Sequence, residues 1–157
     1  MNTEPLCVLY HHTPVGWLQL CADAQGLCGV HFVPQPGPDR GDCPVLTLAA
    51  TQLDEYFAGQ RRQFTLPLSL NGQGTPFQRR VWAALCRIPY GTTCSYGELA
   101  AAVGCPRGAR AVGMANHNNP LAIVVPCHRV VNRGSGLGGY AGGLAIKQQL
   151  LALEGAR

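Results

Sequence analysis

Residues 95–116 have the sequence SYGELAAAVGCPRGARAVGMAN, and this segment predicts two short helices joined by a tight turn. Its first four residues, Ser95-Tyr96-Gly97-Glu98, form a capping box, in which a serine and an acid three residues later satisfy the first N–H groups of a helix. That helix is expected to run through Val103. After a turn at 105–108, a second helix is expected over 109–116. Two helices joined by a glycine-containing turn are typical of a helix-turn-helix unit.

The second predicted helix carries one long side chain among small ones. Arg110 is flanked by Ala109 and Ala111, and Gly113 follows. Small residues let the backbone approach a partner closely, so the arginine is the side chain that can protrude farthest. This pattern suits insertion into a groove, although helix pairs of this kind are more often packing units than nucleic-acid readers.

Charges are few and unevenly placed along the chain. Charged residues make up 13% of the 157 residues, about half of the roughly 25% in an ordinary soluble domain. Residues 1–60 carry one base and six acids, whereas residues 61–133 carry nine arginines and one acid. Arginine favours bidentate or stacking contacts with phosphates and bases, which points to nucleic acid. A GC-rich genome would produce the same arginine content.

The first third of the chain predicts a small antiparallel sheet followed by a helix. Residues 7–10, 17–21 and 27–32 alternate apolar and polar side chains between turn signals, which is typical of short strands. Apolar residues between Leu46 and Phe57 recur at helical spacing.

A candidate linker, Asn-Gly-Gln-Gly at 71–74, divides the chain. Before it, residues 64–70 alternate around a proline and predict an edge strand or an extended connector. After it, Thr75-Pro76 has the cap and first-position proline that begin a helix. We therefore expect two domains, 1–72 and 73–157.

The eight cysteines accompany no secretory signal, so reduced and mostly buried thiols are expected. Cys21, Cys28 and His31 are the set with some zinc-binding potential, but they lack the paired spacing of structural zinc sites, and no metal is expected. No apolar run approaches the roughly 18 residues of a membrane span, and a cytoplasmic protein is expected.

Cys127 differs from the other cysteines because a histidine follows it directly and an arginine comes next. Adjacent imidazole or cationic groups lower the pKa of a thiol, and the thiolate is the reactive form. A buried structural cysteine is the alternative. The apolar run at 121–125, bounded by prolines, predicts a short buried strand that leads to Cys127.

The end of the chain adds a glycine-rich loop and a helix. Loop 134–143 surrounds Tyr140 and offers backbone N–H groups and an aromatic face to a planar ligand. The predicted helix 144–153 is followed by Glu154. An acid at a helix C-terminus opposes the macrodipole, so Glu154 is expected to have a specific partner.

Residues 126–130, PCHRV, resemble the acceptor motif of the O6-alkylguanine-DNA alkyltransferases, the methylated-DNA-protein-cysteine methyltransferases. The resemblance covers residues 75–155 in order and spacing, and the N-terminal segments more weakly. It is carried by TPFQ at 75–78, IPYG at 88–91, Ser95-Tyr96, RAVG at 110–113, Asn119-Pro120 and LEG at 153–155. The chain is most similar to the bacterial constitutive type.

The resemblance implies an α+β fold. A ribonuclease H-like N-terminal α/β domain, 1–72, would hold the small antiparallel sheet and a helix. A mainly helical, winged-helix-like domain with the helix-turn-helix, 73–157, would bind DNA and accept the alkyl group.

The activity implied by the resemblance is direct-reversal DNA repair. Cys127 would take the alkyl group irreversibly from O6-alkylguanine, with O4-alkylthymine as a second candidate substrate, in nucleotides flipped out of the duplex. Each molecule would act once, as a single-turnover cysteine S-methyltransferase. The resemblance implies no cofactor and no metal. It implies a monomer that binds the minor groove of double-stranded DNA and does not bind membranes.

The catalytic set implied by the resemblance is Cys127, His128, Glu154 and Asn119. His128 would act as a base on the thiol through a water, and Glu154 would fix its tautomer and stabilise the imidazolium. Asn119 matches the asparagine that ties the recognition helix to the acceptor strand.

The same resemblance implies how DNA and the damaged base are held. Arg110 would fill the vacancy in the base stack, and Tyr96 would rotate the target phosphate and hydrogen-bond the flipped base. Backbone carbonyls of Cys127 and Val130 would accept from the exocyclic amine of guanine. The full DNA-contacting set is Ser95, Tyr96, Ala109, Arg110, Ala111 and Gly113, and the substrate-pocket set is Tyr96, Pro126, Val130, Tyr140 and Ala141.

Two other classes of protein compete with this interpretation. A lesion-binding protein flips bases without transfer, but such relatives lack the acceptor cysteine. A cysteine hydrolase would use Cys127 and His128, but hydrolases usually draw the base from a distant segment, and no oxyanion pattern stands out.

Overall fold

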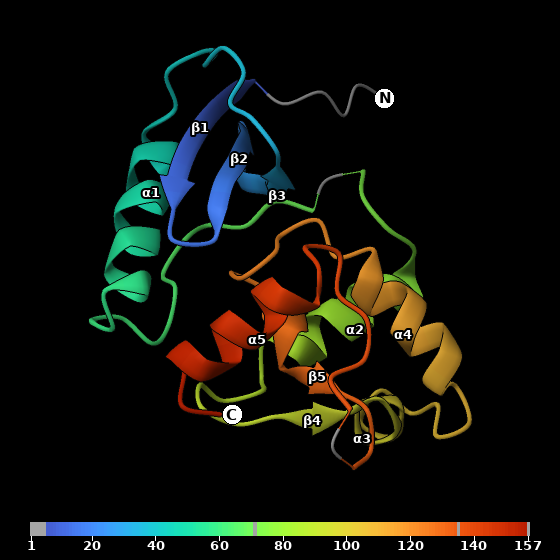
Figure 1. Cartoon of the computed structure of the whole chain (residues 1–157). Coiled ribbons are helices and arrows are strands. Elements are labelled where there is room, and N and C mark those ends of the chain that lie inside the picture. The colour runs from blue at the N-terminus through green and yellow to red at the C-terminus, as the bar shows by residue number, and fades with distance from the viewer. Residues whose placement is uncertain (1–5, 71, 135, 157) are drawn as a thin grey trace. The chain divides into compact units, whose positions relative to one another are not determined.

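The computed structural model describes residues 6–70, 72–134 and 136–156 (Figure 1). The chain divides into two compact units, Met1–Gln73 and Gly74–Arg157. Within the described ranges, none of the helices combines the length and the apolar character that a membrane span requires.

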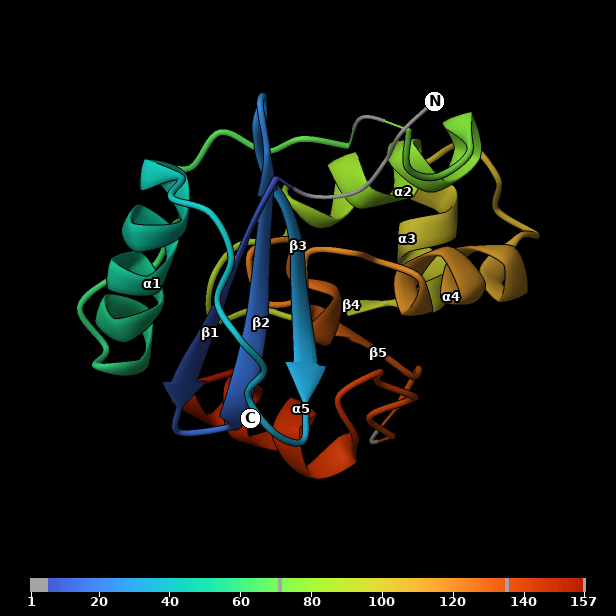
Figure 2. The same cartoon turned by 90° about the horizontal axis from the view of Figure 1, so that it is seen from above.

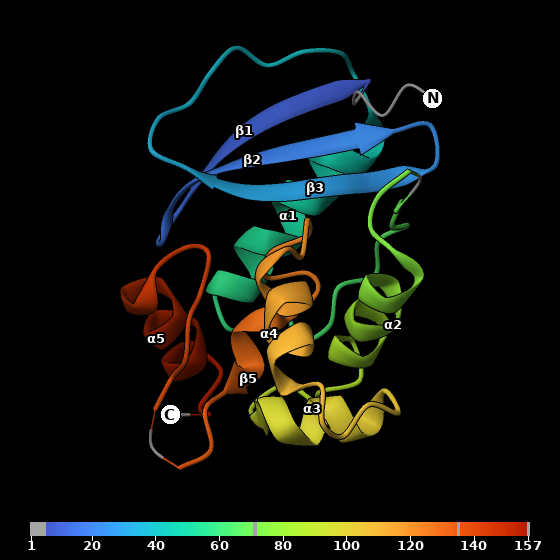
Figure 3. The ribbon, with the colours of Figure 1, turned by 90° about the vertical axis from the view of Figure 1, so that its right-hand side faces the viewer.

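The N-terminal unit is a three-stranded antiparallel sheet covered by one helix. The strands lie in the order β1–β2–β3, as Figure 3 shows, with β1 at Cys7–Thr13, β2 at Gly16–Asp23 and β3 at Gly26–Val33. All three predicted strands are confirmed. Helix α1, Pro44–Phe57, lies along one face of the sheet (Figure 2) and contacts every strand.

Alternation of side chains along the strands produces the core of this unit. Leu18 and Leu20 of β2 are fully buried, as is Leu53 of α1. Side chains two positions apart share one face of a strand, and the apolar stripe of α1 supplies the facing layer. The predicted segment 64–70 is an extended connector, which adds one bridge between Leu68 and Leu27.

Two cysteine expectations are wrong. Cys7 at the start of β1 and Cys43, the residue that caps α1, form a disulfide with a Cα–Cα distance of 6.0 Å. The path of the loop between β3 and α1 brings the two residues into bridging range, although they are 36 positions apart. The free thiols are also less buried than expected. Cys21 and Cys127 are buried, whereas Cys86 is exposed and three others are half-buried.

The C-terminal unit begins with helix α2, Pro76–Leu85, and continues with the predicted helix pair. Capping boxes at Thr75 and at Ser95 begin α2 and α3, and each has both of its reciprocal hydrogen bonds. Helix α3 spans Tyr96–Ala102, and α4 spans Ala109–His117. Helix α4 contacts both α2 and α3 (Figure 3). The helix pair predicted from residues 95–116 is therefore confirmed.

The remaining elements of this unit surround Cys127. The 3-10 turn η1, Cys127–Arg129, leads into β5, Val130–Val131, which pairs in parallel with β4, Cys94–Ser95. Helix α5, Leu144–Leu153, has the predicted bounds.

The strand predicted over residues 121–125 is wrong, because this segment is a buried turn. Asn119 explains the difference. Its side chain accepts from the Leu121 N–H at 3.0 Å and donates to the Val125 carbonyl at 2.8 Å. Ile123 has a φ of 70°, a left-handed conformation that β-branched residues rarely adopt. The side-chain amide of Asn119 thus forms hydrogen bonds with backbone groups that would pair with a neighbouring strand if this segment were part of a sheet.

Candidate functional site

Cys127 is the first residue of η1 and lines a small cavity of about 180 Å³ in the C-terminal unit. Two helices and the glycine-rich loop supply the walls. Besides Cys127, the lining residues are Tyr96 of α3, Gly113, Asn116 and His117 of α4, and Gly139, Tyr140 and Ala141 of the loop. The structure therefore brings Tyr96, Gly113, Tyr140 and Ala141 of the predicted sets to Cys127.

The thiol of Cys127 is not activated in the way its sequence neighbours suggested. Burial raises its pKa, and the opposing influences come from Asn119, Lys147 and Tyr140 rather than from the adjacent His128 and Arg129. Consecutive residues of a 3-10 turn project about 120° apart, because the turn has three residues. Because burial raises its pKa, the thiol is protonated at neutral pH, and its reaction requires a base.

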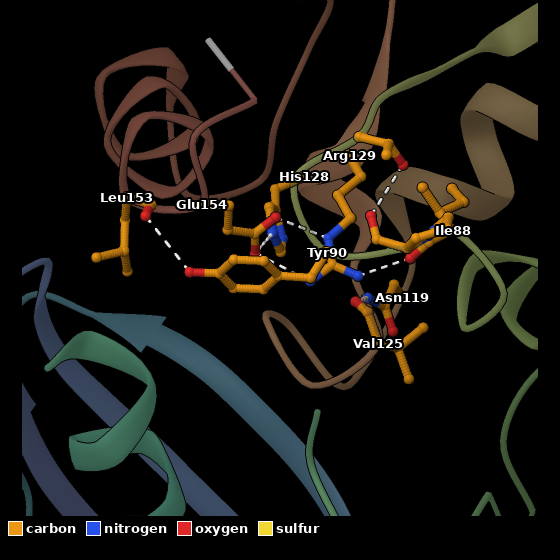
Figure 4. A network of polar contacts seen from close by, with 10 residues as sticks. Ile88, Tyr90, Asn119, Val125, His128, Arg129, Leu153 and Glu154 are labelled. Carbon is orange, nitrogen blue, oxygen red and sulfur yellow. Dashed lines mark hydrogen bonds and ion pairs between the residues drawn. The ribbon is translucent and has the colours of Figure 1, made fainter. Parts of the chain in front are cut away.

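His128, which follows Cys127 in the chain, forms a fully buried pair with Glu154 (Figure 4). Nε2 of His128 lies 2.7 Å from Oε2 of Glu154, which follows α5 directly. The expectation that Glu154 has a specific partner is thus confirmed. An ionised carboxylate only accepts hydrogen bonds, so Nε2 carries the proton and Nδ1 is the basic nitrogen. Nδ1 makes no hydrogen bond to any residue that the structure describes.

The imidazole of His128 is neutral in this environment. Burial lowers its pKa below the ordinary value, and the charges of Arg129 and Lys147 act in the same direction, whereas Glu154 acts against them. A neutral imidazole with an unprotonated Nδ1 is able to accept a proton.

Arg129 was not among the predicted site residues, yet it is buried against Glu154. Its Nε donates to Oε1 at 2.8 Å, and its Nη2 donates to Oε2 at 3.0 Å. The remaining donor, Nη1, binds the carbonyl of Ile88 at 2.7 Å. Adjacency to Cys127 was the one signal in the sequence, and it pointed to the wrong partner.

Two further residues that the sequence analysis left without a role hold the backbone of the acceptor segment. Asn116 Nδ2 donates to the carbonyl of Cys127 at 3.3 Å. Lys147 Nζ donates to the carbonyls of Val130 at 2.5 Å and Gly139 at 3.1 Å. A lysine on the apolar stripe of a predicted helix was a usable signal, since lysine is seldom buried without a partner. Each carbonyl expected to bind the base thus already accepts a hydrogen bond, and the carbonyl of Cys127 accepts a second one from the Val130 N–H.

The other predicted residues lie close to the cavity or on its outer side. Pro126 and Val130 are buried next to η1 and are not among the residues that line the cavity. Ala109, Arg110 and Ala111 form an exposed surface at the start of α4. Ser95 caps α3 and lines a separate, open depression.

The glycine-rich loop approaches Tyr96 closely. A Cβ on Gly138 would lie 2.8 Å from the Tyr96 hydroxyl oxygen, and its φ is +75°. A side chain at this position would displace the loop from the tyrosine, so glycine allows the cavity to close around Tyr96.

No group of three or more His, Cys, Asp or Glu side chains that could hold a metal ion gathers within residues 6–70, 72–134 and 136–156.

A helix-turn-helix beside a buried cysteine, with a buried His–Glu pair behind it, defines a nucleic-acid-binding protein with a cysteine-based site. Two family models match the chain. The first is "6-O-methylguanine DNA methyltransferase, ribonuclease-like domain", over residues 6–70, and the second is "6-O-methylguanine DNA methyltransferase, DNA binding domain", over residues 76–156. The chain belongs to the 6-O-methylguanine DNA methyltransferase family.

Curated relatives and solved structures agree with this assignment. The methylated-DNA–protein-cysteine methyltransferase of Mycobacterium tuberculosis is 44% identical over 98% of this chain and 87% of its own. The constitutive enzyme of Bacillus subtilis is 56% identical over 74% of this chain and 70% of its own. The crystal structure of Mycobacterium tuberculosis OGT in complex with DNA has a TM-score of 0.85 and 44% identity, over 94% of this chain and 91% of that one. The predicted α+β fold and the resemblance to the constitutive bacterial type are confirmed.

Proposed function

We propose that this protein repairs alkylated DNA by direct reversal, with Cys127 as the alkyl acceptor. The sulfur attacks the alkyl carbon on O6 of guanine, so that an S–C bond forms as the C–O bond breaks. The electron pair of the broken bond returns to the base, and the restored guanine takes up at N1 the proton that the thiol gives up. The S-alkylcysteine is stable, so each molecule acts once.

The observation that carries this function is the arrangement of Cys127, His128 and Glu154. The thiol is buried with a raised pKa, and the neighbouring imidazole is neutral with its Nδ1 unoccupied by described residues. In the proposed relay, a water passes the proton from Sγ to Nδ1, while Glu154 holds the Nε2–H tautomer. Asn119 and Tyr140 act to lower the pKa of the thiol, and they would donate to the sulfur and stabilise the thiolate as it forms.

Access to the O6 atom requires that the nucleotide leave the base stack. In our proposal α4 enters the minor groove of double-stranded DNA, where its small exposed residues allow close approach. Arg110 fills the gap left by the flipped base. Tyr96 rotates the target phosphate and contacts the base, and Ser95 and Gly113 lie against the DNA.

The damaged base would occupy the cavity in front of Cys127. Tyr140 and Ala141 would wall the alkyl group, with Pro126 and Val130 behind them. The Val130 carbonyl would accept from the exocyclic amine of guanine with its second lone pair. The Cys127 carbonyl accepts from Asn116 and from the Val130 N–H, and it would accept from the same amine by sharing or exchanging the Asn116 hydrogen bond. O4-alkylthymine lacks that amine and is the weaker candidate substrate.

Two domains divide the work. Residues 73–157 bind DNA and accept the alkyl group, and residues 1–72 form the ribonuclease H-like domain. We infer a cytoplasmic monomer that needs no cofactor. Lesion binding without transfer is not favoured, because the acceptor cysteine is present and is backed by a base.

The test is incubation with duplex DNA that contains one O6-methylguanine, followed by intact-mass measurement of the protein. We expect the mass of one methyl group per molecule, located on the peptide that contains Cys127. Multiple turnovers, or tight lesion binding with no adduct, would reject alkyl transfer to this residue. Cys127→Ser is the matched variant, which should bind the lesion and gain no mass.

A further inference from the structure

Arg129 is a buried cation, and each of its three guanidinium nitrogens donates a hydrogen bond (Figure 4). Two of its donors hold both oxygens of Glu154, and the third holds the carbonyl of Ile88. Its guanidinium also lies 5.7 Å from the centre of the Tyr90 ring. The hydroxyl of Tyr90 donates in turn to the Leu153 carbonyl at 3.4 Å, one residue before Glu154.

These contacts make Glu154 the centre of a three-residue cluster rather than one half of a pair. Its Oε2 accepts from both His128 and Arg129, and its Oε1 accepts from Arg129. A bidentate arginine fixes the plane of a carboxylate, and with it the direction in which Oε2 meets the imidazole. The position of the His128 ring therefore depends on Arg129.

Charge gives Arg129 a second effect on His128. Glu154 alone beside a buried imidazole would favour the imidazolium form, whereas an arginine paired with that carboxylate offsets most of its charge. The charged groups that face His128 are Glu154, Arg129 and Lys147. Burial keeps the imidazole neutral, and the two cations limit the opposing effect of the one anion.

We propose that Arg129 is a positioning residue for alkyl transfer, which fixes the Glu154 carboxylate and offsets its charge so that His128 Nδ1 stays free to accept the thiol proton. This inference rests on the proposed function. It differs from a purely structural role, in which Arg129 would only tie η1 to Ile88 and to the end of α5.

The pH dependence of the transfer rate separates the two roles. Arg129→Met keeps much of the volume and removes the charge. Without that charge, Glu154 stabilises the imidazolium, and we expect the acid limb of the rate profile to move up by about one pH unit. The single-turnover rate on O6-methylguanine duplex should then fall about fivefold at the pH of the wild-type acid midpoint and recover at alkaline pH.

Two companion variants sharpen the experiment. Arg87→Met removes an exposed arginine next to Ile88, whose carbonyl Arg129 binds, and should leave the acid limb of the rate profile in place. Arg129→Lys keeps the charge but loses the bidentate geometry. It should lower the rate at every pH without moving the limb, and it serves in place of Arg129→Met if that variant does not fold. A limb displaced upward in Arg129→Lys would contradict the role assigned to charge.

The second readout does not depend on transfer. NMR titration of the His128 ring in free protein should show a higher pKa in Arg129→Met than in the wild type. Superimposable rate profiles and ring titrations for the folded Arg129→Met and wild-type proteins would overturn the proposal. If the wild-type protein itself gains no methyl group, the proposed function fails, and the ring titration still tests the effect of Arg129 on His128.

Discussion

Glu154 lies 2.7 Å from His128 although the two residues are 26 positions apart, and both side chains are fully buried. The acid directly follows α5, where the partial negative charge of the helix end disfavours a carboxylate. Its hydrogen bonds to His128 and Arg129 offset that cost. The hydrogen bonds to His128 and Arg129 thus explain why an acid stands at this helix end.

Glu154→Gln should destabilise the protein by about 3 kcal/mol, because Arg129 would remain as a buried charge without its counterion. Urea unfolding of the wild type and the variant measures the effect. Glu55→Gln is the matched control. Its ion pair with Arg61 is partly exposed, so its loss should cost less than about 1 kcal/mol. Equal losses in the two variants would contradict the buried network.

The lowered pKa of His128 predicts that stability falls as the solution becomes more acidic. Folding favours the neutral imidazole. In the unfolded chain the imidazole takes up a proton below about pH 6.5, whereas in the folded chain it stays neutral until the pH reaches its lower pKa. The free energy of unfolding should therefore keep the whole contribution of the neutral imidazole above pH 6.5 and should be lower by about 1 kcal/mol at pH 5.5.

Urea titrations at several pH values between 5.5 and 7.5 measure this dependence. His128→Gln should flatten it, whereas substitution of the exposed His117 by asparagine should leave it unchanged. Burial also lowers the pKa of His31, which adds a smaller contribution of the same sign to the pH dependence of the free energy of unfolding. A dependence that survives in His128→Gln would assign the protonation to another group.

Local signals were enough to predict most of the fold. Helices α2 and α3 begin at capping boxes, whose hydrogen bonds involve residues only three positions apart. The turn at 121–125 was missed because an apolar run does not distinguish a buried strand from a turn held by one side chain, here Asn119. The Cys7–Cys43 pairing depends on the path of a whole loop, which no short pattern records.

The sequence predicted a site residue correctly where the residue type is unfavourable at its position, and it failed where the role depends on the direction of the side chain. Glu154 opposes the helix dipole, and that misfit pointed correctly to a partner. Arg129 is next to His128 in sequence, but the 3-10 turn directs it to Glu154 and away from Cys127. Adjacency in sequence does not determine which group a side chain contacts, so adjacency to Cys127 could not assign the role of Arg129.

The Cys7–Cys43 disulfide should stabilise the N-terminal unit without affecting repair. Replacing both cysteines by serine should lower the free energy of unfolding by about 3 kcal/mol, since the bond closes a loop in the unfolded chain. Thiol titration of the unfolded wild type should find six free cysteines. Cys86→Ser is the control and should leave stability nearly unchanged. Eight titratable thiols would show that the bond does not form.

Arg110→Ala should impair repair of duplex DNA much more than reaction with a free base. In the proposed complex, the arginine compensates for the lost stacking when a nucleotide leaves the duplex, and a free base needs no such compensation. We expect at least about a tenfold loss of rate with O6-methylguanine in duplex DNA, equivalent to about 1.4 kcal/mol. The rate with free O6-benzylguanine should stay within about twofold of the wild type, because Arg110 does not line the cavity at Cys127.

Arg107→Ala, in the turn before α4, is the matched control for loss of one positive charge near the same surface. If Arg110→Ala slows both substrates equally, the arginine acts on the cavity or on folding. If Arg107→Ala matches its effect on duplex DNA, general electrostatic attraction accounts for the loss.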